Sequence, residues 1–159
     1  MDQIKAAVVT ISDTRTPEND LSGNELVQLL LGAGIHVSIR RSSTDDLDAI
    51  SSLLLEICGS GDVDLVLTTG GTGFAPRDNT PEATRSVIER EAPGLAEAIR
   101  RNTSASTPLA MLSRGLCGIR DNVLIINLPG SPKAVRECFE VVRPVLGHAV
   151  ALLRGQKPH

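Results

Sequence analysis

Aromatic side chains are almost absent from this sequence. It contains no tryptophan or tyrosine and only two phenylalanines, Phe74 and Phe139. Non-specific single-strand binders stack bases on aromatic side chains, so this composition argues against such a surface. The formal net charge of −3 also offers no general attraction to nucleic acid, and the arginines are scattered along the chain. We therefore expect no nucleic-acid partner, and a core built from Leu, Ile, Val and Ala.

Long apolar runs and patterned cysteines are also missing. No apolar stretch approaches the ~18 residues that a membrane span needs, and the N-terminal tripeptide MDQ lacks the cationic start of a secretory signal. We expect a soluble, cytoplasmic protein with no membrane partner. Cys58, Cys117 and Cys138 are odd in number and form no CxxC pair, so we expect buried thiols rather than a disulfide framework or a zinc site.

The length and the apolar pattern predict one α/β domain covering residues 1–159. With 159 residues and 41% hydrophobic content, the chain can bury its own core. Short apolar runs predict strands, and between them lie segments of helical period. Expected strands are residues 4–11, 35–39, 65–67, 116–120 and 123–127; expected helices are 22–31, 47–57, 80–91, 95–99, and 132 onward with a further piece from Pro144. This alternation predicts a three-layer α/β/α fold whose sheet is mostly parallel with one antiparallel strand.

Several expected helices begin with a capping signal. A hydroxyl or carboxylate at the N-cap accepts a hydrogen bond from an amide of the first turn, and proline is favoured just after it. The expected caps are Ser22 with Glu25 in a capping box, Thr44 or Asp45, Thr80 followed by Pro81, and Ser131 followed by Pro132.

The segment of residues 65–84 combines an apolar strand, a glycine-rich turn and a helix start. Gly70, Gly71 and Gly73 leave the backbone without side-chain cover, which allows a ligand to approach closely. Asp78 falls just outside the helix expected from Thr80. Two structural alternatives stay open: the glycines can serve only a tight turn, and Asp78 can serve only the capping of the helix.

Further polar residues follow the ends of other expected strands. In open α/β sheets ligands bind at the carboxyl ends of strands, which makes Ser12, Asp13, Gly130 and Ser131 site candidates beside the turn of residues 69–73. Asp45 and Asp78 stand at neighbouring helix starts. Turn formation can equally explain Ser12 and Asp13, and capping can explain Asp45. Backbone amides at such places favour phosphate, and carboxylates beside phosphate call for Mg²⁺.

Common nucleotide-binding motifs do not account for this pattern. The chain lacks the GxxxxGK[ST] loop, and GGTGFA is not a GxGxxG fingerprint with an acid ~20 residues further on, so an ordinary kinase or dehydrogenase is disfavoured. Residues 68–84, TTGGTGFAPRDNTPEAT, instead resemble the signature segment of the MogA/MoaB family of molybdenum-cofactor biosynthesis proteins, which includes the gephyrin G-domain. Asn79 departs from that segment, where Val commonly stands. The resemblance extends from Ser12-Asp13 to the LPGSPK segment at residues 128–133.

The resemblance implies a molybdopterin-binding fold and molybdopterin adenylyltransferase activity, in which ATP and Mg²⁺ convert molybdopterin to adenylyl-molybdopterin and pyrophosphate. It implies Asp45 and Asp78 as catalytic and metal-binding residues, and Gly130 and Ser131 as nucleotide-binding residues. It implies that a group of residues at the same rim binds molybdopterin: Ser12, Asp13, Thr69, Gly70, Gly71, Thr72 and Gly73. It further implies a homotrimer or larger homo-oligomer, and the molybdate-inserting enzyme of the pathway as a partner.

Two other functions stay open at this point. Some MoaB-type members hold molybdopterin without adenylylating it, and both aspartates could remain in such a protein. An oligomeric scaffold, as the gephyrin G-domain partly is, is disfavoured because the chain shows no linker or partner domain. An acid-pocket phosphoreceiver is disfavoured because no lysine follows a late strand at the required place.

Overall fold

A single six-stranded sheet forms the centre of the computed structural model, which describes residues 2–157. Its order is β2-β1-β3-β6-β5-β4. The strands are β1 (Lys5–Ile11), β2 (His36–Ser43), β3 (Leu65–Thr69), β4 (Arg90–Glu91), β5 (Cys117–Arg120) and β6 (Val123–Leu128). The pairs β1–β2, β1–β3 and β3–β6 are parallel, whereas β5 runs antiparallel to both β6 and β4. The predicted sheet, mostly parallel with one reversed strand, is confirmed.

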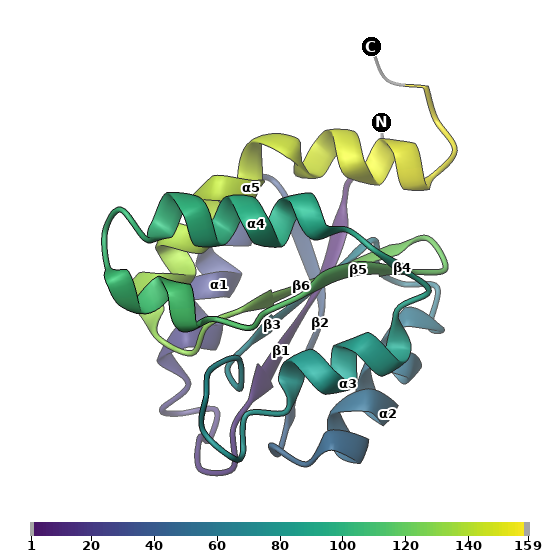
Figure 1. The fold of residues 1–159 in the computed structure, drawn as a ribbon. Coiled ribbons are helices and arrows are strands. Elements are labelled where there is room, and N and C mark those ends of the chain that lie inside the picture. Colours follow the sequence, from purple (N-terminus) through teal and green to yellow (C-terminus); the bar gives the residue numbers. More distant parts are fainter. Residues whose placement is uncertain (1, 158–159) are drawn as a thin grey trace.

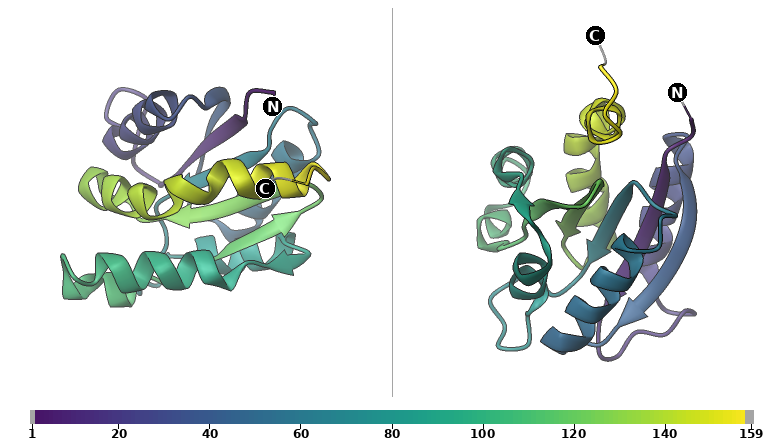
Figure 2. Two further views of the ribbon diagram at one scale, coloured as in Figure 1. Left: turned by 90° about the horizontal axis from the view of Figure 1, so that it is seen from above. Right: turned by 90° about the vertical axis from the view of Figure 1, so that its right-hand side faces the viewer.

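Helices cover both faces of this sheet. They are α1 (Leu21–Gly32), α2 (Leu47–Cys58), α3 (Thr80–Val87), α4 (Pro93–Thr103), the 3-10 helix η1 (Pro108–Leu112) and α5 (Pro132–Leu153). Helices α1, α4 and α5 lie on one face and α2 and α3 on the other (Figures 1 and 2). The three-layer prediction is therefore confirmed. No helix within residues 2–157 is both long and apolar enough to cross a membrane.

The central strands divide their side chains between two cores. Along β1, Ala6 and Val8 join the cluster with α1 and α5, while Ala7, Val9 and Ile11 join the cluster with α2 and α3. This is the period of two that a strand buried on both faces requires. Phe139 is fully buried, and the other core residues are aliphatic or cysteine. The three cysteines are buried and free, as expected.

The ends of α3 and α5 differ from the prediction. Helix α3 stops at Val87 rather than near Glu91, because the backbone then pairs with β5: Glu89 N donates to Ile119 O (2.8 Å) and Ala92 N to Cys117 O (2.8 Å). Helix α5 continues through Pro144 as one helix of 22 residues. Pro144 is exposed, and burial of neighbouring residues on the same helix outweighs the hydrogen bond that proline removes.

The predicted cap of α1 is wrong. Helix α1 begins at Leu21, and its cap is Asp20, whose carboxylate accepts from Gly23 N (3.0 Å). The second Asp20 oxygen accepts from Thr10 Oγ1 (2.6 Å) on β1. Ser22 is buried inside the first turn. A cap that also bonds β1 secures the loop of residues 12–20 at both ends.

Candidate functional site

The predicted site residues gather at one rim of the sheet. Strands β1, β3 and β6 are adjacent and parallel, so the loops after their carboxyl ends meet there (Figure 1). Thr69 Oγ1 donates to Pro129 O (2.7 Å), and Gly70 N donates to Leu128 O (3.0 Å). The glycine-rich turn and the segment before α5 are thereby joined at a fixed spacing.

The fold itself requires two of the glycines. Gly70 and Gly71 have φ values of 106° and 70°. A Cβ at Gly70 would lie 2.4 Å from Ile11 O, and one at Gly71 would lie 2.4 Å from Thr80 Oγ1. The turn alternative thus accounts for these two residues. Gly73 has no positive φ, and a Cβ there would lie 3.0 Å from Asp78 Oδ2. Its missing side chain leaves room beside a carboxylate.

Thr80 is the first residue of α3 and not its cap, so that prediction is wrong. The cap is Asn79, which forms no side-chain capping bond. Thr80 Oγ1 donates to Gly70 O (2.9 Å), and Thr80 N donates to Gly71 O (3.1 Å). The threonine therefore fastens the glycine turn to the helix. The carboxylate of Asp78 accepts from Ala75 N (2.9 Å) and closes its own loop. The alternative that Asp78 serves helix capping is wrong as well.

Asp45 is likewise free of a capping role. The cap of α2 is Asp46, whose Oδ2 accepts from Ala49 N (2.9 Å), so the prediction of Thr44 or Asp45 is wrong. Asp45 and Asp13 exchange two hydrogen bonds: Asp45 N donates to Asp13 Oδ1 (2.8 Å), and Asp13 N donates to Asp45 Oδ2 (3.1 Å). This exchange brings the end of β1 against the start of α2.

The end of β1 also carries a local turn and an ion pair. Ser12 Oγ accepts from Thr14 N and Arg15 N, each at 3.2 Å, as the turn alternative for Ser12 requires. Arg77, from the glycine-rich loop, forms an ion pair with the Asp13 carboxylate. A positive side chain thus lies across the rim between the two loops.

The charges of Asp45 and Asp78 repel each other. Partial burial raises the pKa of Asp45 above its usual value, and the negative charge of Asp78 raises that pKa further. Asn79 Nδ2 donates to Asp45 O (3.0 Å), which ties the two aspartate-bearing segments together. Two carboxylates held in mutual repulsion favour a cation beside them.

The donor set fits Mg²⁺ bound together with phosphate. One oxygen of each aspartate accepts an amide, from Asp13 to Asp45 and from Ala75 to Asp78, which leaves the other oxygen for a further ligand. Within residues 2–157 no group of three or more His, Cys, Asp or Glu side chains could hold a metal alone. Mg²⁺ is usually held by one or two carboxylates plus substrate phosphates, so this pair would suffice once phosphate is present.

The start of α5 completes the rim. Ser131 caps this helix as predicted, with Oγ accepting from Ala134 N (3.2 Å), and Pro132 occupies the first helical position. A Cβ on Gly130 would meet Gly70 Cα at 3.4 Å, so the helix start lies directly beside the glycine turn. The N-terminal amides of a helix this long present partial positive charge toward an anion.

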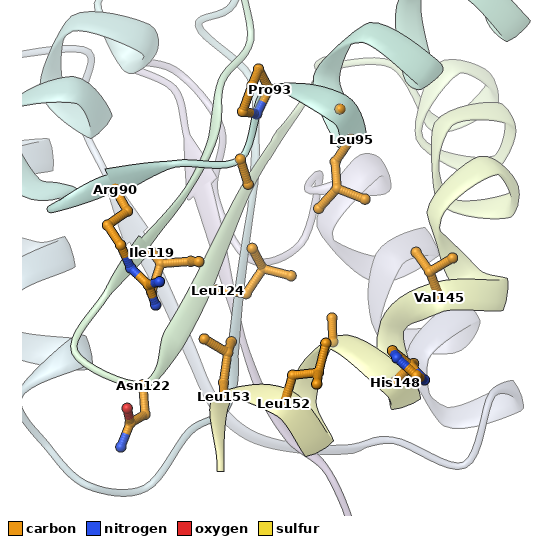
Figure 3. A pocket seen from close by; sticks show the side chains of 13 residues that line it. Arg90, Pro93, Leu95, Ile119, Asn122, Leu124, Val145, His148, Leu152 and Leu153 are labelled. Carbon is orange, nitrogen blue, oxygen red and sulfur yellow. The ribbon is translucent and has the colours of Figure 1, made fainter. Parts of the chain in front are cut away.

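A cavity of about 320 Å³ opens beside the turn. Its walls include Thr72 and Gly73 from the turn and Pro129 and Ser131 from the segment before α5. The remaining wall is mostly apolar and comes from α4, η1 and α5, with Arg100 and Glu137 as its charged residues. A second, larger hollow lies elsewhere. It is lined by β5, β6, the start of α4 and the end of α5 (Figure 3).

Sequence reasoning missed Arg114 as a residue of the site. Residues 110–114 lie within the extent of the family resemblance, but no motif there indicated a contact. In the structure the Arg114 guanidinium donates to the carbonyls of Gly73 (2.9 Å) and Asp78 (2.8 Å) and pairs with Glu82 (2.6 Å). These partners lie more than thirty positions away in the sequence, so only the folded chain reveals them.

The fold and this rim define a three-layer α/β protein with a glycine-rich turn and a carboxylate pair at the carboxyl ends of parallel strands. Residues 7–148 match the family described as "Probable molybdopterin binding domain". The chain belongs to this family, and the recognition made from its signature segment is confirmed.

Individual relatives are similar over nearly the whole chain. The molybdenum cofactor synthesis protein cinnamon of Drosophila melanogaster is 46% identical over 96% of this chain, which spans only 26% of that protein. A molybdopterin adenylyltransferase of Helicobacter pylori is 41% identical over 98% of this chain and 90% of its own length. The crystal structure of the molybdopterin biosynthesis enzyme MoaB from Thermus thermophilus has a TM-score of 0.89 and 42% identity, covering 98% of this chain and 99% of that one.

Proposed function

We propose that this chain acts in molybdenum cofactor biosynthesis by transferring the adenylyl group of Mg-ATP to molybdopterin. The observation that carries the proposal is the pair Asp45 and Asp78, whose negative charges repel each other at the rim and which do not cap a helix. Relatives named for molybdenum cofactor synthesis and for molybdopterin adenylylation support the assignment.

The reaction is a phosphoryl-type transfer. An oxygen of the terminal phosphate of molybdopterin bonds to the α-phosphorus of ATP, while the bond from that phosphorus to the bridging oxygen breaks and pyrophosphate leaves with the electron pair. Bound Mg²⁺ would offset the negative charge that accumulates on the phosphates. The protein's share is to hold the two phosphates in line and to exclude water.

Each part of the rim then has a proposed role. Asp45 and Asp78 hold the metal and orient the phosphates. Gly130 and Ser131, at the positive start of α5, bind the nucleotide. The turn of residues 69–73, with Ser12 and Asp13, receives molybdopterin, and the mostly apolar cavity beside Gly73 suits its ring system.

Assembly is part of the proposal. We infer a homotrimer or a larger homo-oligomer, and the molybdate-inserting enzyme of the pathway as a partner, because the resemblance to the MogA/MoaB family implies both. Analytical ultracentrifugation of the purified chain measures the first, and a single monomeric species at micromolar concentration would contradict it.

A direct assay tests the activity. Purified protein is incubated with ATP, Mg²⁺ and molybdopterin, and adenylyl-molybdopterin and pyrophosphate are measured. We expect both products from the parent and almost none from Asp45→Asn or Asp78→Asn. Molybdopterin binding by the parent without either product would favour the alternative, a MoaB-type binding protein.

A further inference from the structure

The side chain of Arg114 holds the glycine-rich loop from outside at two backbone carbonyls. Arg114 follows η1, and its own amide donates to Thr72 O (2.8 Å). Its Nε donates to Gly73 O (2.9 Å), and its Nη2 donates to Asp78 O (2.8 Å). Arg114 therefore bonds carbonyls on both sides of the exposed tip, residues 74–77.

Glu82 fixes the orientation of that guanidinium. Arg114 Nη1 lies 2.6 Å from Glu82 Oε2, and Nη2 lies 3.2 Å from Oε1, which is the two-point contact that a planar guanidinium forms with a carboxylate. The Arg114 guanidinium lowers the pKa of the Glu82 carboxyl. Glu82 lies in the first turn of α3, so the guanidinium is aligned against the helix that follows the loop.

Few other contacts set the shape of the loop: Arg77 pairs with Asp13, and Asn79 Nδ2 donates to Asp45 O (3.0 Å). Glycines contribute no side-chain contacts, and the tip is joined to itself only through Ala75 and Asp78: Ala75 N donates to Asp78 Oδ2 (2.9 Å), and Asp78 N donates to Ala75 O (2.9 Å). The second oxygen of that carboxylate is the one left for a ligand. Its position depends on the place of the Asp78 backbone, which Arg114 holds.

We propose that Arg114 is a positioning residue that sets the place of the Asp78 carboxylate and thereby the affinity of the rim for a divalent cation bound to nucleotide. The inference rests on the proposed metal role of Asp78. Arg114 itself is proposed to contact neither the metal nor the substrate. Lysine could not replace it, because a single ammonium cannot span the Gly73 and Asp78 carbonyls and the Glu82 carboxylate in one plane.

The test compares Arg114→Lys and Glu82→Gln with a matched control. Arg143→Lys is that control, because Arg143 pairs with Glu140 on the exposed face of α5, with Nη2 at 3.0 Å from Oε2, away from the loop. The first readout needs no ligand: hydrogen exchange of the Ala75 and Asp78 amides. The second is the affinity for Mn²⁺ with ATP, measured by electron paramagnetic resonance without molybdopterin.

We expect faster exchange of both amides and about tenfold weaker Mn²⁺–ATP binding in Arg114→Lys, the usual scale for losing a group that orients a metal ligand. Glu82→Gln keeps the guanidinium and should show a smaller loss in the same direction, so the idea stays testable if Arg114→Lys folds poorly. Parent-like exchange and affinity in both variants would overturn the proposal, as would equal losses in Arg143→Lys.

This result is separable from the proposed activity. If the parent makes no adenylyl-molybdopterin, but Arg114→Lys binds Mn²⁺–ATP more weakly than the parent, the proposed adenylyltransferase activity is refuted. The positioning role of Arg114 is then supported. If the parent forms adenylyl-molybdopterin and Arg114→Lys shows unchanged amide exchange and Mn²⁺–ATP affinity, the positioning role of Arg114 is refuted. The proposed adenylyltransferase activity then still holds.

Discussion

Two hollows of this molecule differ in size and in chemistry. The larger, of about 640 Å³, lies between the start of α4, the end of α5 and the strands β5 and β6. Its lining includes Ile119, Leu124, Val145 and Leu152, and no carboxylate is among the lining residues within 2–157 (Figure 3). The smaller, of about 320 Å³, adjoins the glycine turn and the rim that holds Asp45 and Asp78. Charge and backbone geometry, rather than volume, therefore identify the candidate site.

The topology explains the difference. Leu124 is near the start of β6, and Asn122 precedes that strand, so the large hollow lies toward the amino ends of the parallel strands. Loops from neighbouring parallel strands converge at the carboxyl ends instead. Only there can a turn after β3, a turn after β1 and the start of α5 meet.

The largest expected effect is on Asp78. Asp78→Asn preserves shape but removes the charge, so turnover should fall by about 10²-fold or more, the scale of losing one preorganised electrostatic group. The melting temperature should change little, because the amide oxygen can still accept from Ala75 N. Leu152→Ala in the large hollow is the control and should leave turnover unchanged. Loss of turnover in Leu152→Ala would instead indicate that the large hollow is the active site.

The second largest expected effect is the difference between alanine substitutions at two glycines of the turn, Gly71 and Gly73. Gly71→Ala forces a positive φ and a contact 2.4 Å from Thr80 Oγ1, so it should lower the free energy of unfolding by about 1–3 kcal/mol. Gly73→Ala needs no positive φ and should fold like the parent while weakening molybdopterin binding. Thermal melts and calorimetry measure the two quantities. Equal destabilisation by both changes would mean that Gly73 also serves only the fold.

Ser131 gives a smaller effect that separates capping from binding. Ser131→Ala should cost about 1 kcal/mol of stability, and Asn or Asp at this position should largely restore it, because both cap well. ATP affinity should instead fall in the order Ser, Asn, Asp, since Asp places negative charge against a phosphate. Calorimetry with Mg²⁺ present gives the affinities. If Ser131→Asp binds ATP like the parent, Ser131 is only a cap.

The smallest effect concerns the pH dependence of stability. The pKa of Asp45 is raised in the folded state, so its ionisation is less favourable there than in the unfolded chain. The parent should lose stability as the pH rises from below 3.8, the ordinary value, through the folded pKa. Asp45→Asn avoids that loss. Its melting temperature should therefore exceed the parent's slightly at pH 7, and the gap should close below pH 3.8; a gap independent of pH would contradict this origin.

Much of the fold was predictable because burial leaves a regular pattern. The apolar runs at β1, β3 and β6 and the Ser131 cap are local signals, and each was confirmed. The two-residue strand β4 was missed because Arg90 and Glu91 are exposed and polar, and only pairing with β5 makes them a strand. The caps were shifted because adjacent residues offer equivalent oxygens, as Asp45 and Asp46 do, and the tertiary fold decides between them.

The sequence predicted that the candidate residues gather at one rim, but not which hydrogen bonds join them. Strand order places Asp13 beside Asp45 and Gly130 beside Gly70, which follows from the parallel sheet. The identity of each partner does not follow: neither the Asp13–Asp45 exchange nor the Arg114 contacts leave a sequence signature. Long side chains that reach across loops depend on distances that only the folded chain sets.

The location of bound nucleotide decides whether the rim, rather than the large hollow, is the site. Mg²⁺ and ATP are titrated into ¹⁵N-labelled protein, and the amide chemical shifts are followed by nuclear magnetic resonance. The largest shifts should fall on the amides of Asp78, Gly130 and Ser131, while those of Leu124 and Leu152 stay unchanged. Chemical-shift changes only at residues lining the large hollow, with none at the rim, would contradict the assignment of the rim as the nucleotide site.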